Sequence, residues 1–225
     1  MRSRINFRYF KKFKDSLDFL IKGIYAGFMI GVGAIAFLSV SDKVLGSFLF
    51  SIGLLTVCMY GMNLYTGKIG YIINNKVSYL KEVLLGLLGN LIGSLLVGNL
   101  ALLTRNGAAI STKANDMCAI KLGDSLLSIF MLSAFCGLLI HIAVNNYKKI
   151  NTEIGKYAGI FMCVMVFILC GFEHSIANMT YITIAGVWSL KALLYELVMI
   201  LGNAAGALFI SWFYNLYYKW YKNKK

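Results

Sequence analysis

The segment that decides the fold is Gly171-Phe172-Glu173-His174-Ser175-Ile176-Ala177-Asn178-Met179, inside the apolar stretch Gly159–Trp188. A transmembrane helix needs about 20 apolar residues, so this stretch is too long for one simple span. Ionisable side chains at membrane depth cost from about 2.5 kcal/mol upward and persist where they face a cavity or a partner. Glu173 and His174 therefore predict a helix that is interrupted inside a bilayer. Such a break exposes backbone amides, and a positive helix N-terminus favours an anion.

The composition around this segment predicts a membrane protein. The chain has 225 residues, of which 59% are hydrophobic and only 14% charged, against about 25% charged in soluble domains. A soluble core of this length could not bury so much apolar surface. The 22 Lys and Arg outnumber the 9 Asp and Glu, but they lie in short clusters between apolar runs. That arrangement is typical of membrane topology and argues against nucleic-acid binding.

Six apolar stretches can each cross a bilayer. They are Leu17–Val40, Val44–Tyr65, Leu80–Leu103, Leu126–Val144, Gly159–Trp188 and Ala192–Tyr214. The second runs into Gly67 and Gly70, so we expect both the second and the fifth helix to be interrupted. The chain contains no proline, so glycine or polar side chains must cause these breaks. The first stretch follows a basic arm but lacks an A-x-A-like cleavage site, which indicates a retained helix.

Basic residues predict the orientation. With six spans, 17 of the 22 Lys and Arg fall on the side of the two termini, which the positive-inside rule assigns to the cytoplasm. We therefore expect a multi-pass protein of the cell (inner, cytoplasmic) membrane with both termini cytoplasmic. The predicted organisation is a single transmembrane channel domain over 1–225, with a basic arm at 1–16, repeats at 17–103 and 126–214, and a basic tail at 215–225.

The two halves of the chain resemble each other. Leu88-Gly89-Asn90-Leu91-Ile92-Gly93-Ser94-Leu95 is similar to Leu201-Gly202-Asn203-Ala204-Ala205-Gly206-Ala207-Leu208, and each string follows a glycine, Gly61 or Gly171, by about 30 residues. With three helices per half, the second half enters from the opposite side, which makes an inverted repeat. The predicted fold class is an all-α integral membrane protein with two inverted three-helix repeats. The matching break in the first half is Gly61-Met62-Asn63-Leu64-Tyr65-Thr66-Gly67, where Thr66 could donate a hydrogen bond to an anion or to His174.

The strings at 171–179 and 61–67, with Gly202-Asn203, resemble the formate/nitrite transporter family over nearly the whole chain. The resemblance implies an aquaporin-like protomer with its own pore and a homopentamer. It implies that His174 is the central pore histidine and that Thr66 faces it. It also implies that Glu173 and Asn178 brace the interrupted fifth helix.

The same resemblance implies further pore residues. Phe50 and Leu54 correspond to one apolar constriction and Phe167 to the other, with His174 and Thr66 between them. Lys121, which lies in the connection after the third span, corresponds to a basic residue that attracts anions into a vestibule. Without the family, each of these four would be interpreted as a core, lipid-facing or solvated side chain.

We therefore expect a channel for a small monovalent anion. The amino-acid sequence of the second helix resembles that of the hydrosulfide-channel branch of the family. In the fourth helix, Gly137 stands where many formate-conducting members have an asparagine. Hydrosulfide (HS⁻) is thus the favoured anion, with formate, nitrite and chloride also expected to permeate. The alternative is a proton-coupled formate or nitrite transporter, because His174 could serve either mechanism.

Other function classes fit the sequence less well. An enzyme is not expected, because the chain has no paired carboxylates and no Cys–His couple at plausible spacing. The five Cys lie mostly in apolar runs without a CxxC pair, so we expect packing residues, no metal and no cofactor. A regulatory membrane protein without transport remains a third possibility that a flux assay would separate.

Overall fold

The computed structural model describes residues 2–222, and the side chains of residues 14–222. The predicted basic arm at 1–16 and tail at 215–225 therefore lie partly outside the described residues. All regular structure from residue 2 to residue 222 is helical. The helices are α1 (Arg2–Ser39), α2 (Lys43–Met59), α3 (Tyr65–Lys68), the 3₁₀ helix η1 (Ile69–Asn74), α4 (Ser78–Leu102), α5 (Gly107–Gly123), α6 (Leu126–Lys149), α7 (Glu153–Leu169), α8 (Ser175–Ala185) and α9 (Leu190–Lys222).

The helix ends follow local chemistry. Asp42 caps α2 by accepting a hydrogen bond from the backbone N–H of Leu45, and Ser125 caps α6 by accepting from Ser128. These side chains satisfy amides that have no partner within the helix. Gly186 ends α8 in the left-handed conformation at φ +70°, which glycine adopts without steric strain.

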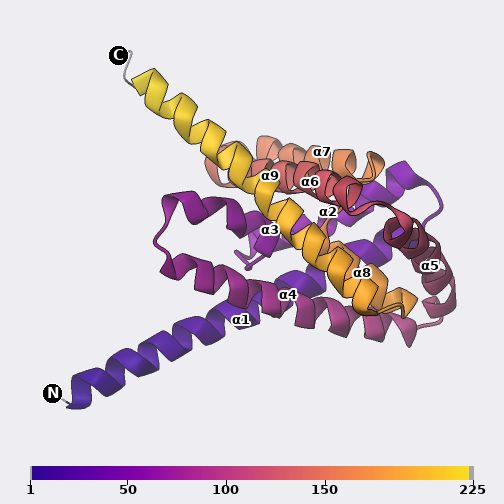
Figure 1. Cartoon of the computed structure of the whole chain (residues 1–225), viewed down its shortest axis with the longest axis horizontal. Coiled ribbons are helices and arrows are strands. Elements are labelled where there is room, and N and C mark those ends of the chain that lie inside the picture. The colour runs from indigo at the N-terminus through magenta and orange to yellow at the C-terminus, as the bar shows by residue number, and fades with distance from the viewer. Residues whose placement is uncertain (1, 223–225) are drawn as a thin grey trace.

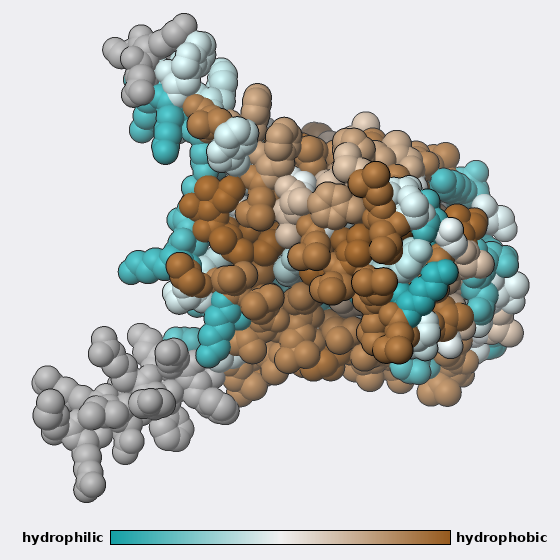
Figure 2. All heavy atoms as spheres, in the orientation of Figure 1, coloured by the Kyte–Doolittle hydropathy of each residue, from teal (hydrophilic) through white to brown (hydrophobic). Residues whose placement is uncertain are grey.

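Within the described part of the chain, four helices are long and apolar enough to cross a membrane: α1 from Lys14 to Ser39, α4, α6 and α9. α2 is apolar but shorter, and it is followed by α3 after a break. Figure 2 shows the apolar surface as a brown band, with hydrophilic residues gathered at both ends of the molecule. α1 begins and α9 ends at the same end of the bundle, whereas α5 lies at the opposite end (Figure 1). We refer to these as the terminal end and the α5 end.

The two predicted interruptions are confirmed. The chain leaves helical geometry between α2 and α3, and again between α7 and α8. The predicted boundaries were less accurate, because α1 begins well before Leu17 and α7 begins at Glu153 rather than at Gly159. The connection between the third and fourth spans contains the 17-residue helix α5, which no apolar stretch predicts and which packs against α8.

The packing of the two halves corresponds element by element. α1 packs against α2 and α4, as α6 packs against α7 and α9. At the α1–α4 crossing, the backbone of Asn90 leaves no room for a Cβ at Gly27, and at the α6–α9 crossing the backbone of Asn203 does the same at Gly137. Glycine is thus required at both crossings, since a side chain would separate the helices.

Candidate functional site

The second break, at Cys170–His174, is held by backbone and amide hydrogen bonds. Gly171 takes φ +72°, and the N–H of Phe172 donates to the carbonyl of Phe167 at 2.8 Å. The Asn203 side chain accepts from the N–H of Ser175 at 2.9 Å and donates to the carbonyls of Ser133 and Glu173, each at 2.8 Å. One buried amide therefore satisfies two backbone groups that the interruption leaves without helical partners, the N–H of Ser175 and the carbonyl of Glu173, and also ties the break to the carbonyl of Ser133 on α6.

The first break repeats this pattern 110 residues earlier. Gly61 takes φ +61°, and the N–H of Met62 donates to the carbonyl of Val57 at 2.9 Å. The Asn90 side chain accepts from Tyr65 at 2.8 Å and donates to Gly23 at 2.8 Å and Asn63 at 2.9 Å. Each backbone group that Asn90 contacts has its counterpart 110 residues later among the groups that Asn203 contacts. Asn90 and Asn203 are therefore equivalent residues of the two halves.

His174 and Thr66 meet where the two breaks approach each other. Nε2 of His174 lies 2.9 Å from Oγ1 of Thr66, and both side chains are buried. Nδ1 of His174 accepts a hydrogen bond from the N–H of Ala177 at 3.1 Å and so caps α8. In the neutral imidazole the proton therefore resides on Nε2, which donates to Thr66. The Thr66 hydroxyl hydrogen is then available to a second acceptor. The expected proximity of the two residues is confirmed, and their role in conduction stays a prediction.

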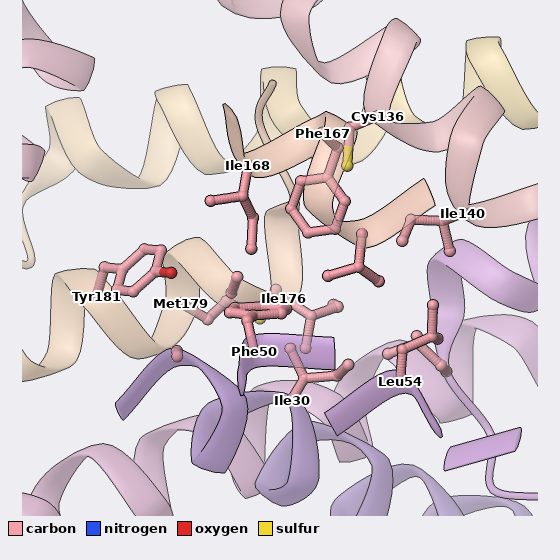
Figure 3. Close-up of a cluster of buried hydrophobic side chains, with 14 of the residues drawn as sticks. Ile30, Phe50, Leu54, Cys136, Ile140, Phe167, Ile168, Ile176, Met179 and Tyr181 are labelled. Carbon is pink, nitrogen blue, oxygen red and sulfur yellow. The ribbon is translucent and has the colours of Figure 1, made fainter. Parts of the chain in front are cut away.

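The apolar residues Phe50, Leu54 and Phe167 are all buried. The rings of Phe50 and Phe167 are in edge-to-face contact with their centroids 5.7 Å apart, and the Phe167 ring stacks on the His174 imidazole at 5.8 Å. Figure 3 shows Phe50 and Phe167 facing each other, with Leu54 nearby on the same helix as Phe50. The assignment of Phe167 to a separate constriction was wrong, because Phe167 closes against Phe50 itself.

Lys121 lies on α5 and is not a free loop charge. Its Nζ is 2.5 Å from Oε2 of Glu173, and the same oxygen accepts from the amide of Asn178 at 2.8 Å. The three residues form a largely buried group, with Lys121 partly exposed, that ties α5 to the second break. Glu173 and Asn178 thus brace the interrupted helix as the resemblance implied, whereas the positive charge of Lys121 is largely offset by Glu173.

Two cavities open toward this centre from opposite ends. The α5-end cavity has a volume of about 310 Å³, and its wall includes Lys43, Lys121, Phe167 and His174. The terminal-end cavity has a volume of about 170 Å³ and is walled by Val57, Cys58, Gly61, Met62, Leu64, Gly67, Lys68, Val144, Tyr147 and Lys148. Phe50, Leu54 and Thr66 are buried and line neither cavity. The arrangement suits a passage that is closed at its centre and open at both ends.

Several residues of this site were missed by sequence reasoning. Leu64 corresponds to His174 under the 110-residue displacement, and it lines the terminal-end cavity with Val57 and Val144. Asn90 and Asn203 lie inside the two repeated strings and hold equivalent positions there. Pairing the two strings residue by residue would have identified both amides.

Gly137, which stands where many formate-conducting members of the family have an asparagine, lies at a helix crossing. A Cβ at this position would overlap the backbone of Asn203 at the α6–α9 crossing. Gly137 therefore acts in helix packing at this crossing.

Glu196 is an ionisable residue at membrane depth that the sequence analysis did not select. It lies on α9, is 4% exposed, and neither carboxylate oxygen has a hydrogen-bond partner among the described residues. It faces an apolar groove between α4 and α9 that Leu84, Leu88 and Leu197 also line. The Cys side chains are all free, and no group of His, Cys, Asp and Glu in the described part of the chain is arranged to hold a metal ion.

The geometry can be compared with known proteins. The model of the formate/nitrite transporter family matches residues 9–217. The nitrite transporter NirC of Escherichia coli (strain K12) is 28% identical over 94% of this chain and 85% of its own length. The formate-nitrite transporter of Plasmodium knowlesi (strain H) is 27% identical over 87% of this chain and 75% of its own. These relatives are transporters, not enzymes.

Solved structures show the same fold. A pentameric formate channel with formate bound superposes with a TM-score of 0.79 at 23% identity, covering 91% of this chain and 98% of the channel. An FNT family ion channel superposes with a TM-score of 0.74 at 22% identity, covering 94% and 90%. The family match spans both breaks, His174 and Thr66, and the chain therefore belongs to the formate/nitrite transporter family.

Proposed function

We propose that this protein is a membrane channel for small monovalent anions, with the conduction path running between the two cavities past His174 and Thr66. The observation that carries the proposal is the 2.9 Å contact between these side chains, which come from two different helix breaks. Nothing in this mechanism requires covalent chemistry. The family membership and the channel structures with the same fold support the proposal of an anion channel.

The proposed path has three parts. An anion enters a cavity at either end while it is still hydrated. The Phe50–Phe167 contact then excludes hydrated ions, because removing water from a charge in an apolar slot is expensive. A hydrogen bond from the Thr66 hydroxyl, or from Nε2 of His174 when it exchanges Thr66 for the anion, offsets part of that cost at the centre, as charge-assisted hydrogen bonds are stronger than neutral ones.

We further propose the architecture around this path. The protomer crosses the membrane six times as two inverted three-helix repeats, with its residues 17–103 and 126–214 in opposite orientation. Each break supplies one side of the path, and both termini face the cytoplasm. Five protomers assemble into a homopentamer, which the pentameric assembly of a formate channel with this fold supports.

Hydrosulfide is the anion we favour, because the sequence of the second helix resembles the hydrosulfide-channel branch and because of the acid–base chemistry of hydrosulfide. HS⁻ and H₂S interconvert near neutral pH, so an exchange of a proton with His174 would be readily reversible. The alternative is proton-coupled transport of formate or nitrite, which the similarity to nitrite and formate-nitrite transporters favours equally. In that mechanism His174 delivers a proton and the neutral acid crosses the apolar contact.

A flux panel in proteoliposomes tests both readings. Vesicles containing the protein are presented with HS⁻, formate, nitrite, chloride, acetate and lactate, and current and internal pH are recorded together. We expect a current that follows the anion gradient, largest for HS⁻, and loss of that current in His174→Ala. Electroneutral flux with matched proton movement would select the coupled transporter, and absence of flux for every anion would overturn the proposal.

A further inference from the structure

The terminal-end cavity has basic side chains in its wall. Lys68, the last residue of α3, and Lys148, near the end of α6, both line it. The other wall residues are apolar or uncharged, and the wall contains no Asp or Glu. Gly67, the neighbour of Thr66 in the chain, lines the same cavity as the two lysines.

These two lysines are not neutralised by neighbours. The ion pairs among residues 14–222 join Lys22 to Asp18, Lys121 to Glu173 and Lys156 to Glu153. Lys148 Nζ instead lies 4.2 Å from the centroid of the Tyr71 ring, and Lys68 Nζ lies 5.8 Å from that of Phe19. Aromatic contacts of this kind stabilise a cation but leave its charge intact.

Two further charges act on Lys68 from outside the cavity. Glu82 attracts it and Lys22 repels it. Neither lines the cavity, and Lys22 is already paired with Asp18 at 2.7 Å. The cavity wall itself therefore carries two positive charges with no acidic residue among them.

The opposite cavity differs at matching positions. Under the 110-residue displacement Lys68 corresponds to Asn178, whose amide is engaged by Glu173. In the α5-end cavity the charge of Lys121 is offset by Glu173, and Lys43 donates to the carbonyl of Leu169 at 3.2 Å. Two cavities with the same backbone therefore differ in net charge, and the more positive one is at the terminal end.

We propose that the terminal-end cavity is a second anion-binding subsite, in which Lys68 and Lys148 together hold one small monovalent anion. Two positive charges in the wall of one confined cavity both attract an anion, which raises the local anion concentration. The transport consequence rests on the proposed function: anions presented at the terminal end should saturate the protein at lower concentration than anions presented at the α5 end. The charge of the cavity itself does not depend on conduction.

The native Cys58 provides a probe inside this cavity. It lines the wall and is partly exposed, whereas Cys118 and Cys136 are buried. Replacing Cys163 and Cys170 by Ala leaves Cys58 as the reactive thiol. The matched control combines these changes with Cys58→Ile and Ile168→Cys, since Ile168 is the counterpart of Cys58 in the α5-end cavity.

The measurement is the ratio of modification rates by an anionic and a cationic methanethiosulfonate reagent of similar size, in detergent-solubilised full-length protein. We expect this ratio to be about fivefold or more higher at Cys58 than at the control cysteine, and to fall as salt increases. Lys68→Gln combined with Lys148→Gln should remove the excess, and Lys68→Arg with Lys148→Arg should retain it. Formate, nitrite or chloride should slow modification by the anionic reagent only where the two positive charges are present.

Equal ratios at the two cavities, or a ratio that the two Gln substitutions leave unchanged, would overturn the subsite. Elution of each variant as the same oligomer as the parent protein shows that the variants fold. Modification of the cysteine needs no conduction, so the two proposals can fail separately. Absence of flux together with a raised rate ratio at Cys58 would reject the channel and keep the subsite. Anion flux together with equal rate ratios would keep the channel and reject the subsite.

Discussion

The two helix breaks have the same backbone and opposite side chains. In the first break Leu64 is apolar and Thr66 is polar, whereas in the second the matching residues are His174 and Ile176. Asn90 and Asn203 hold the two backbones with equivalent hydrogen bonds. The comparison separates two tasks: glycine and asparagine make the interruption stable in a membrane, and one polar residue from each break supplies the chemistry.

The largest effect on stability should come from the asparagines. Asn90→Ala and Asn203→Ala each leave two backbone groups of a break without a partner, an N–H and a carbonyl, at about 1–3 kcal/mol per group. We expect each to destabilise the folded protein by several kcal/mol and to a similar extent, measured as thermal unfolding in detergent. Asn99→Ala is the control, because Asn99 is exposed and bonds only within α4. If one asparagine proved dispensable, the equivalence of the two breaks would be lost.

The ion pair that distinguishes the second break should have the next largest effect. Glu173→Gln leaves Lys121 without its acidic partner, and removing one member of a buried pair costs about 3 kcal/mol. Lys121→Met likewise leaves the charge of Glu173 without its basic partner. We expect the double variant to be more stable than either single variant, and a double-mutant cycle measures that coupling. Additive losses would show that the two side chains act independently.

The glycines that open the breaks should have a smaller and matched effect. Gly61 and Gly171 both take positive φ, and a Cβ at either would meet no atom within 4 Å. Only backbone strain remains, so Gly61→Ala and Gly171→Ala should each cost about 1–2 kcal/mol. The same assay of thermal unfolding applies, and Gly27→Ala should be far more damaging because α4 leaves it no space. A larger loss at Gly61 than at Gly27 would contradict this order.

Glu196 should have the smallest effect. Its buried carboxylate makes no hydrogen bond within the described residues, so Glu196→Gln keeps its shape and removes no such contact. We expect a change in unfolding free energy below about 1 kcal/mol, in either direction, and unchanged anion flux. A loss as large as that of Glu173→Gln would mean that Glu196 has a partner in the assembled oligomer.

Much of this fold could be predicted from sequence because the membrane allows few solutions. Apolar length located the helices, and Glu173 with His174 located a break where a continuous helix would bury charge. α5 was missed because its polar sequence, from Gly107 to Gly123, has neither the length nor the hydropathy of a span. It is held by packing against α8, which no local pattern reveals.

The site was predicted in part for a similar reason. The approach of His174 to Thr66 followed from the repeat. Three features depend on which helix faces join, and linear spacing does not contain that information. They are the contact of Phe167 with Phe50, the pairing of Lys121 with Glu173 and the packing role of Gly137. Orientation in the membrane and the identity of the anion stay predictions.

Anion flux through a matched pair of variants tests the central claim most directly. His174 and Leu64 occupy equivalent positions in the two breaks, so His174→Leu removes the central hydrogen-bond donor while Leu64→Met preserves the apolar character of its cavity. The account predicts that His174→Leu lowers proteoliposome flux by about tenfold or more, the value of a hydrogen bond to a charged group, and that Leu64→Met leaves flux near that of the wild-type protein. Flux through folded His174→Leu equal to that of the wild type, at every pH, would contradict it.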